Sequence, residues 1–319
     1  MESVSQFAMP FQLPTCQVVP MPDNQVSLQI DGEERTRWHF DAKYPRPFFY
    51  PLIGPSGDTL TRMGHPGAQN HDHHRSVWWA HAKVDGEDYW SENGGTQIRQ
   101  RLWLAYTDGN DEAIMATRAG WINKAGREVL EQEMMTSVRP GPEDEWFLEL
   151  QSTFTPKAAQ VTLEQSNFGL FAVRVAAGVA SYWGDGEITS SEGAQGEPAI
   201  FGQSAAWMDY SGAVAARRNG KGVAVTEGIT YFDHEINPSY PSHWHVREDG
   251  WMGASLCRHE PVVIRQEEPL RVRYLLHIHR EAVNSAVAGR LADLFNASPG
   301  FTVIPAKRKH RQFEVMREK

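Results

Sequence analysis

Residues 44–90 read YPRPFFYPLIGPSGDTLTRMGHPGAQNHDHHRSVWWAHAKVDGEDYW, and this stretch decides how the rest of the chain is interpreted. Five of the 13 histidines fall in the 17 residues from His65 to His81. An imidazole donates and accepts hydrogen bonds, titrates near neutral pH and binds metals. One such histidine is explained by a loop hydrogen bond, but five beside Arg75 and a Trp-Trp pair favour a functional site.

Outward from this stretch, the chain consists of many short apolar or alternating segments separated by polar turns. The 27 Gly and 19 Pro residues punctuate it and favour strands and turns over long helices. Strand-like segments lie at 25–30, 99–106, 113–122, 129–138, 146–151, 161–164, 169–175, 222–226 and 272–279. Their spacing, roughly 8 to 15 residues, predicts an all-β fold of large antiparallel sheets.

Local signals set the expected boundaries. Asp31-Gly32 and Asp85-Gly86 predict hairpin turns. The prolines within 44–52 argue against a central strand there. Apolar residues at intervals of four predict one short C-terminal helix over 280–296, ended by Asn296 and Pro299-Gly300.

The chain is expected to form a single β-sandwich domain over 1–319, because it shows no internal repeat and no long linker. Residues 1–22, with four prolines, are expected to form an irregular arm or a first edge strand. Residues 305–319 are expected to form a solvated tail, which contains the basic segment 307–311.

Composition and charge exclude several classes of function. The formal net charge is −9, which argues against a nucleic acid as the main partner. No apolar run reaches the roughly 18 residues of a membrane helix, so no membrane partner is expected. Cys16 and Cys257 form no CxxC pair, and no secretory signal is evident, so we expect a reduced, cytoplasmic protein.

Three groups of residues carry the candidate chemistry. The first is the histidine stretch itself. If 70–74 is extended, His71 and His73 share a face and His74 points the opposite way. Metal binding by these histidines stays open, because a zinc site draws three or four such ligands but no specific ligand spacing is present.

The second group is 233–247, where His243 and His245 would share one face of a strand and Trp244 the other. An alternative is that Asp233 and His234 merely cap a turn.

The third group contains Asp209, flanked by aromatic residues, and Arg174, which interrupts an apolar strand. Burial between aromatic residues would raise the pKa of Asp209 toward a catalytic range, or else Asp209 bonds the following turn. A buried Arg174 requires a carboxylate or a ligand, whereas on the solvent face it is an ordinary strand residue. No phosphate loop, dinucleotide fingerprint or serine hydrolase elbow occurs.

The chain resembles a known family in six segments. They are RPFFYPLIGPSGDTLTR at 46–62, HDHHRSVWWAH at 71–81, VDGEDYW at 84–90, GLFAVRV at 169–175, WMDYSG at 207–212 and DHEINPSYPSHWHVR at 233–247. In this order they resemble the bacterial PmoA-like family, whose members are often labelled methane oxygenases. The resemblance implies a galactose mutarotase-like β-supersandwich and work on carbohydrates, in which a His and a carboxylate act on a sugar ring.

We therefore predict a carbohydrate-active enzyme that cleaves a glycoside or epimerises a sugar by acid–base chemistry, with a small-molecule sugar or glycoside as its partner. The catalytic candidates are His73, His74, Asp209 and His245. The substrate-binding candidates are Arg46, Tyr50, His65, Arg75, Trp79, His81, Arg174, His234 and Trp244. The alternatives are a non-catalytic sugar-binding module and a metal-dependent hydrolase or oxygenase. No cofactor is required by the sequence, while a divalent metal and a homo-oligomer stay open.

Overall fold

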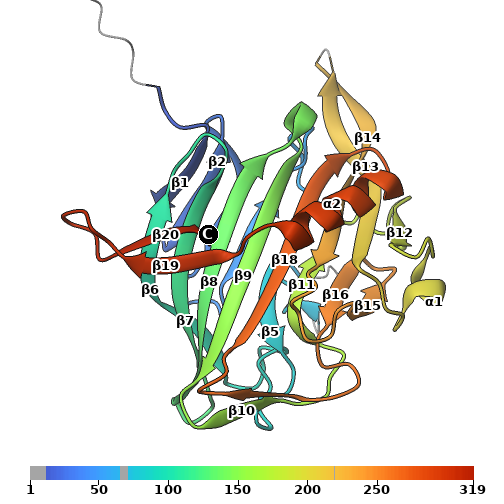
Figure 1. Ribbon diagram of the computed structural model, residues 1–319. Helices are drawn as coiled ribbons and strands as arrows, with labels where there is room; N and C mark the ends of the chain where they lie inside the picture. The colour runs from blue at the N-terminus through green and yellow to red at the C-terminus, as the bar shows by residue number, and fades with distance from the viewer. Residues whose placement is uncertain (1–11, 65–70, 219) are drawn as a thin grey trace, which may run out of the picture.

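The computed structural model describes residues 12–64, 71–218 and 220–319, and two large antiparallel sheets dominate it (Figure 1). Each sheet has eight strands, and the largest apolar cluster draws side chains from both sheets. The predicted all-β sandwich with a short C-terminal helix is confirmed.

The first sheet, called the cleft sheet below, has the strand order β1-β2-β3-β4-β5-β11-β16-β15. Its strands are β1 (Cys16–Met21), β2 (Gln25–Ile30), β3 (Glu33–His39), β4 (Phe48–Leu52), β5 (Val77–His81), β11 (Gly169–Arg174), β16 (Trp251–Ser255) and β15 (His243–Arg247). All neighbouring pairs in it are antiparallel.

The second sheet, called the helix sheet, has the order β12-β13-β14-β18-β9-β8-β7-β6. Its strands are β12 (Glu187–Ser190), β13 (Trp207–Arg218), β14 (Lys221–Asp233), β18 (Leu270–Arg280), β9 (Trp146–Pro156), β8 (Glu128–Pro140), β7 (Ala113–Ile122) and β6 (Gln97–Thr107).

Among the described residues, four further strands form two small two-stranded sheets, and the helices are short. The pairs are β10 (Gln160–Leu163) with β17 (Val262–Arg265), and β19 (Phe301–Pro305) with β20 (Phe313–Arg317). The helices are α1 (Glu197–Ile200), α2 (Ser285–Ala297) and the 3-10 turn η2 (Pro142–Asp144).

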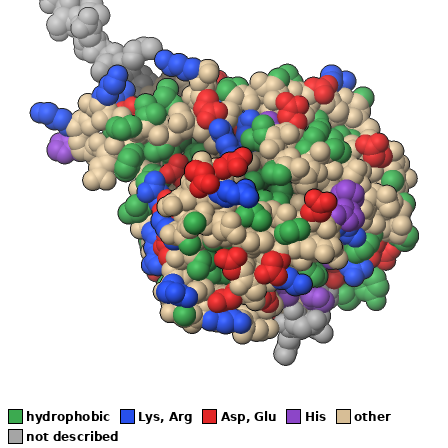
Figure 2. Space-filling view, turned by 60° about the horizontal axis from the view of Figure 1, so that its bottom comes forward, with side chains coloured by type: hydrophobic (Ala, Val, Ile, Leu, Met, Phe, Trp, Pro, Cys, Tyr) green, Lys and Arg blue, Asp and Glu red, His purple; other side chains and the backbone are tan. Residues whose placement is uncertain are grey.

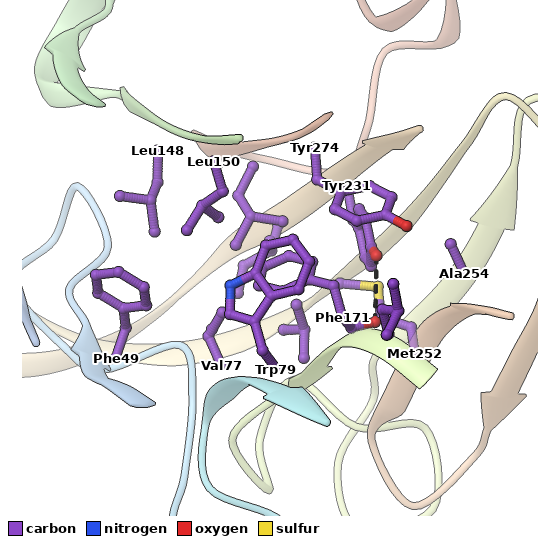
Figure 3. Close-up of a cluster of buried hydrophobic side chains, with 14 of the residues drawn as sticks. Phe49, Val77, Trp79, Leu148, Leu150, Phe171, Tyr231, Met252, Ala254 and Tyr274 are labelled. Carbon is purple, nitrogen blue, oxygen red and sulfur yellow. Dashed lines mark hydrogen bonds between the residues drawn. The ribbon is translucent and has the colours of Figure 1, made fainter. Parts of the chain in front are cut away.

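The space between the two large sheets is filled by aromatic and aliphatic side chains (Figure 3). Because side chains alternate along a strand, each strand sends every second residue into this core. Trp79 of β5 points inward and packs on Phe171 and Tyr274, whereas its neighbour Trp78 belongs to a separate cluster on the outer face. The hydroxyl of Tyr231 donates to the Phe171 carbonyl across the core at 3.2 Å.

The outer face of the helix sheet is covered, as Figure 1 shows, by α2 and by the β19–β20 hairpin. Phe295 of α2 packs with Trp207 and Phe232 of the sheet. Phe301 and Val315 of the hairpin pack with Leu104 and Met135. The outer face of the cleft sheet carries a different cluster, of Phe48, Trp78, Ala80, Trp90, Ala172 and Trp251.

Several expected boundaries are wrong. β4 lies inside the cleft sheet, between β3 and β5, although 44–52 contains three prolines. The sheet tolerates Pro51 because β4 pairs with β5 only at Phe48 and Phe49, and its pairing with β3 is irregular.

At the N-terminal end, residues 16–21 form the edge strand that was one of the two expected alternatives. The C-terminal end is more regular than expected, because 313–317 form β20 within the expected tail. The helix begins at Ser285 rather than 280, since the Asn284 side chain accepts hydrogen bonds from the N–H groups of Ala286 and Val287.

Acidic and basic side chains are interspersed on the face shown in Figure 2. Cys16 and Cys257 are both buried, and neither forms a disulfide. Across 12–64, 71–218 and 220–319, none of the helices has the length and apolar character that crossing a membrane requires.

Candidate active site

A cleft opens on the outer face of the cleft sheet, with a volume of about 540 Å³. We call it the histidine cleft, because His71, His73 and His74 line it. Its other lining residues lie in the β5–β6 connection, just before and at the end of β11, in the β11–β12 connection, in α1, and from the end of β15 through the turn to the start of β16. They are Trp90, Phe168, Arg174, Tyr182, Glu197, Arg247, Glu248, Asp249 and Trp251. Its volume lies within the roughly 300–1,000 Å³ typical of small-molecule sites.

The three histidines are gathered by a turn. The N–H of His74 donates to the carbonyl of His71 at 3.0 Å, so this segment is not extended. The ring centroids are 4.4 Å apart for His73 and His74, 5.2 Å for His71 and His74, and 6.2 Å for His71 and His73. The prediction that His74 points away from the other two is therefore wrong, because it assumed a strand.

The buried Arg46, the partly buried Arg75 and one glutamate hold this turn in place. Arg46 donates from Nη2 to the carbonyl of His73 at 2.7 Å and from Nη1 to the carbonyl of Tyr89 at 2.8 Å. Glu92 accepts two bonds of 2.7 Å from Arg75 and lies 3.2 Å from Arg46. Arg46 and Arg75 thus position the histidine turn, and neither lines the cleft as a substrate ligand.

His74 is neutral at pH 7 and almost buried. It is 4% exposed and stacks on Trp78 with centroids 5.4 Å apart. Burial, and next the neighbouring charges of His73 and Arg174, lower its pKa far below the ordinary value. Its Nδ1 has no hydrogen-bond partner among the described residues. A neutral imidazole of this kind hydrogen-bonds a hydroxyl well but takes up a proton poorly.

Arg174 lies fully buried at the cleft and forms an ion pair there. It comes from the end of β11, and its Nη1 donates to Oδ1 of Asp249 at 2.9 Å. Its Nε and Nη2 have no hydrogen-bond partner in the described part of the chain. Arg62 adds a second positive charge by bonding the Asp249 carbonyl at 3.0 Å. Burial, followed by repulsion from Arg174, lowers the pKa of Arg62 to about 10.

Aromatic side chains form the walls of the cleft. Trp90 and Phe168 each lie about 5.5 Å from Trp251, by ring centroids of 5.5 and 5.6 Å. Phe168 is stacked on Trp251 at an interplanar angle of 8° and is 36% exposed. Tyr182 lies at the mouth.

Histidines from the 71–74 segment and from the 243–245 segment both contact Trp251. His74 lies 5.6 Å from the Trp251 ring and His245 lies 3.9 Å from it, by centroids. His245 is 3% exposed and does not line the cleft, since Phe168 and Trp251 lie against it. Burial and the Arg247 charge lower the pKa of His245 to about 3. His245 therefore supports the aromatic wall from behind.

Asp209 does not join these histidines, so the prediction that places it beside them is wrong. On β13, Met208 and Tyr210 point into the central core, which sends Asp209 to the outer face of the helix sheet. There it accepts bonds from Ser211 at 2.5 Å, Thr230 at 2.8 Å and His279 at 2.8 Å. The alternation of side chains along a strand predicts that Asp209 lies on the opposite face of β13 from Met208 and Tyr210. It does not predict which sheet β13 joins.

Other predicted ligands also lie away from the cleft. Trp79 and Trp244 point into the central core (Figure 3 labels Trp79), where the indole N–H of Trp244 donates to the Ala205 carbonyl. His81 is fully buried and bonds the Glu164 carbonyl. His234 contacts Arg273 and Phe295 beneath α2.

Two candidates remain to be placed. Tyr50 packs beside the outer cluster of the cleft sheet without lining the cleft. His65 lies outside the described residues.

The sequence reasoning missed the cleft carboxylate. Asp249 follows β15 in the run Arg247-Glu248-Asp249-Gly250, which reads as an ordinary charged turn. A signal was present, since that turn follows directly after His243 and His245. The sequence also gave no indication that Trp90, Phe168 and Trp251 form the walls of the cleft, because these walls arise from contacts between segments that are distant in the chain.

Within the described residues, no group of three or more His, Cys, Asp or Glu side chains is arranged to hold a metal ion. The side chains that line the cleft offer hydrogen bonding, ion pairing and proton transfer.

Comparison with known proteins places the chain in a family without giving it an activity. No curated protein matches it. A crystal structure of a GalM/aldose epimerase homologue from C. elegans matches with a TM-score of 0.29 and 8% identity, over 83% of this chain and 99% of that chain. Nothing in these matches supports the resemblance to the PmoA-like family. The model of a family of unknown function, DUF6807, matches residues 25–293, and the chain belongs to that family.

Proposed function

We propose that this protein is a carbohydrate-active enzyme whose active site is the histidine cleft. A sugar ring presents flat apolar C–H faces and a rim of hydroxyl groups. The cleft offers the partly exposed ring of Phe168, which packs on the buried Trp90 and Trp251, together with imidazole, carboxylate and guanidinium groups. This combination suits a sugar better than a purely apolar or a purely ionic ligand.

The observation that carries the proposal is that the buried guanidinium of Arg174 has donors without a hydrogen-bond partner among the described residues. Burying a guanidinium with unused donors costs free energy unless a partner arrives. Its Nη1 is taken by Asp249, while Nε and Nη2 have no partner among the described residues. A hydroxyl or carboxylate oxygen of a sugar bound at the cleft floor supplies the acceptor that Arg174 lacks.

The reaction that this arrangement supports is proton transfer on the sugar. Asp249, oriented by Arg174, accepts a proton from a hydroxyl or an acidic C–H of the substrate. His73, as an imidazolium, returns a proton to the ring or leaving oxygen, and His74 stays neutral and hydrogen-bonds a hydroxyl. The two groups end as a carboxylic acid and a neutral imidazole, and solvent restores both. Removing the proton of an anomeric hydroxyl while protonating the ring oxygen breaks the bond between the anomeric carbon and that oxygen, and reclosure of the ring epimerises this carbon. Removing an acidic C–H proton while protonating the leaving oxygen instead cleaves a glycoside by elimination.

The test is a panel of aldoses, uronic acids and methyl glycosides, followed by proton NMR for anomerised, epimerised or cleaved products. Asp249→Asn and His73→Ala should each lower turnover about 10²- to 10⁴-fold, the usual contribution of acid–base catalysis. His243→Ala is the matched control, because His243 lies in a separate pocket against His259 and should keep full turnover.

Three outcomes separate the hypotheses. Product formation that depends on Asp249 and His73 supports the enzyme. Sugar binding by calorimetry without any product would instead indicate a non-catalytic binding module. If no sugar in the panel binds or reacts, the carbohydrate assignment is overturned.

A further inference from the structure

Two adjacent aromatic side chains stand exposed at the mouth of the histidine cleft. Tyr182 is 66% exposed and Trp183 is 51% exposed, with ring centroids 4.7 Å apart. Tyr182 also lines the cleft. Single exposed apolar residues are ordinary on protein surfaces, but a paired aromatic surface that continues a binding cleft is a common mark of ligand contact.

The backbone holds this pair firmly. The N–H of Tyr182 donates to the Glu248 carbonyl at 2.9 Å, next to the cleft carboxylate Asp249. The N–H of Ser181 donates to the hydroxyl of the buried Tyr210 at 3.2 Å. A side chain at Gly184 would collide with the carbonyl of Gly178, so the segment folds tightly on itself. The two rings are thus presented on a fixed turn.

Polar groups lie beside the pair, as a sugar ring requires. Glu197 accepts a bond of 2.5 Å from Arg247 and one of 2.7 Å from the N–H of Glu248, and all three residues line the cleft. The Arg247 side chain is half exposed and carries further donors. Aromatic faces next to a fixed network of charged hydrogen-bonding groups match a second sugar ring.

We propose that Tyr182 and Trp183 form a second sugar subsite, so that the substrate is a disaccharide or longer glycoside rather than a monosaccharide. This inference rests on the proposed function of the cleft. The first ring lies against Phe168, which packs on Trp90 and Trp251, and the second ring stacks on Trp183, against which Tyr182 packs edge to face at an interplanar angle of 80°. The cleft volume of about 540 Å³ supports it, since sites of this size hold ligands larger than one sugar ring.

The experiment compares affinities by calorimetry for glucose, galactose and xylose with those for cellobiose, maltose, lactose and xylobiose. Wild-type protein should bind at least one disaccharide about tenfold more tightly than its monosaccharide. Trp183→Ala should remove most of that gain, about five- to tenfold, because one aromatic stacking contact contributes roughly that much. Monosaccharide affinity should stay within twofold, and Trp183→Phe should retain the gain.

Tyr106→Ala is the matched control, because Tyr106 is 41% exposed on β6 and lies away from the cleft. If monosaccharides bind but disaccharides gain nothing, or if Trp183→Ala leaves the gain intact, the subsite is rejected and the proposed function survives. If no sugar of either series binds, the proposed function fails and the subsite fails with it.

Discussion

At the scale of single residues, the histidines at 71–74 form a turn whose partners lie elsewhere in the chain. His71, His73 and His74 were visible as a cluster, because they are close in the chain. Asp209 and Asp249 both lie near aromatic residues, and only the pairing of β13 with β12 and β14 separates Asp209 from the cleft. Strand periodicity tells which side chains share a face of one strand, but it does not tell which strands become neighbours.

The same limit explains Arg46 and Arg75, which the sequence suggested as sugar ligands. Both are held by Glu92, 17 residues beyond Arg75. Burial is the main cause that lowers the pKa of Arg46, to about 10, so the side chain remains charged at pH 7 and needs its carboxylate.

We expect Glu92→Ala to destabilise the fold by about 3 kcal/mol, because it leaves a buried guanidinium without its counter-charge. Urea unfolding followed by tryptophan fluorescence measures this. Glu133→Ala is the control: its ion pair with Arg118 is about a quarter to a third exposed, so the loss should stay below about 1 kcal/mol. Equal losses in the two variants would contradict a supporting role for Glu92.

At the scale of elements, strands with a clear alternating pattern were predictable, whereas the start of the C-terminal helix and the strand in the expected tail were not. The segment 25–30 was predicted with the bounds that β2 has. The helix start was placed too early, because the apolar periodicity continues from β18 through Val283, and only the capping bond of Asn284 fixes the first turn. β20 was hidden, because the basic run before it suggested a solvated tail.

The β19–β20 hairpin is fixed to the helix sheet by Arg317. This side chain bonds Glu149 at 2.8 and 3.1 Å and Glu112 at 2.7 and 3.1 Å. Burial lowers the pKa of Arg317, but the bonds to Glu112 and Glu149 outweigh it and raise the pKa. Glu149 is 2% exposed, so it depends on this partner and on Arg273.

Arg317→Ala should therefore lower the free energy of unfolding by about 2–3 kcal/mol. It should also speed hydrogen exchange of the amides in 301–317, because the hairpin loses its anchor. Arg311→Ala, in the exposed connection between β19 and β20, should change stability by less than about 0.5 kcal/mol. Unchanged exchange in 301–317 would show that apolar packing alone holds the hairpin.

At the scale of the whole molecule, the sandwich buries histidines on both of its outer faces as well as in the cleft. Burial is the first cause that lowers the pKa of each of five of them. The pKa falls to about 4 for His81 and His234, to about 3 for His245 and His277, and below that for His74. For three other buried groups the pKa is raised. The pKa of Asp233 rises to about 6 by burial, and burial also raises the pKa of Glu227. The pKa of His279 rises because Asp209 outweighs its burial.

These shifts fix how stability depends on pH. In the unfolded chain a histidine titrates near pH 6.5. Below that pH the unfolded state therefore binds protons at these five positions, whereas the folded imidazoles remain neutral. Their contribution is complete above about pH 6.5 and is lost as the pH falls toward 4. Asp233 acts oppositely, because its carboxyl is protonated when folded at a pH where the unfolded chain ionises it. His279 stabilises below about pH 6.5 and loses this effect as the pH rises through its folded pKa.

Because five groups with a lowered pKa oppose three with a raised pKa, we expect a net loss of stability between pH 6.5 and 5, a window in which ordinary carboxylates hardly titrate. Each histidine whose effect is not balanced by a group of opposite sign lowers the free energy of unfolding by about 1.4 kcal/mol per pH unit. We therefore expect the free energy of unfolding to fall by several kcal/mol by pH 5. Urea unfolding at half-unit pH steps measures the slope. His245→Phe, placed among Phe168, Phe201 and Trp251, removes one titrating group without polar cost, and the slope should fall by about one proton. Equal stability at pH 5 and pH 7 would mean that these imidazoles become protonated without unfolding the chain, and that the cleft is more open to water than its aromatic walls imply.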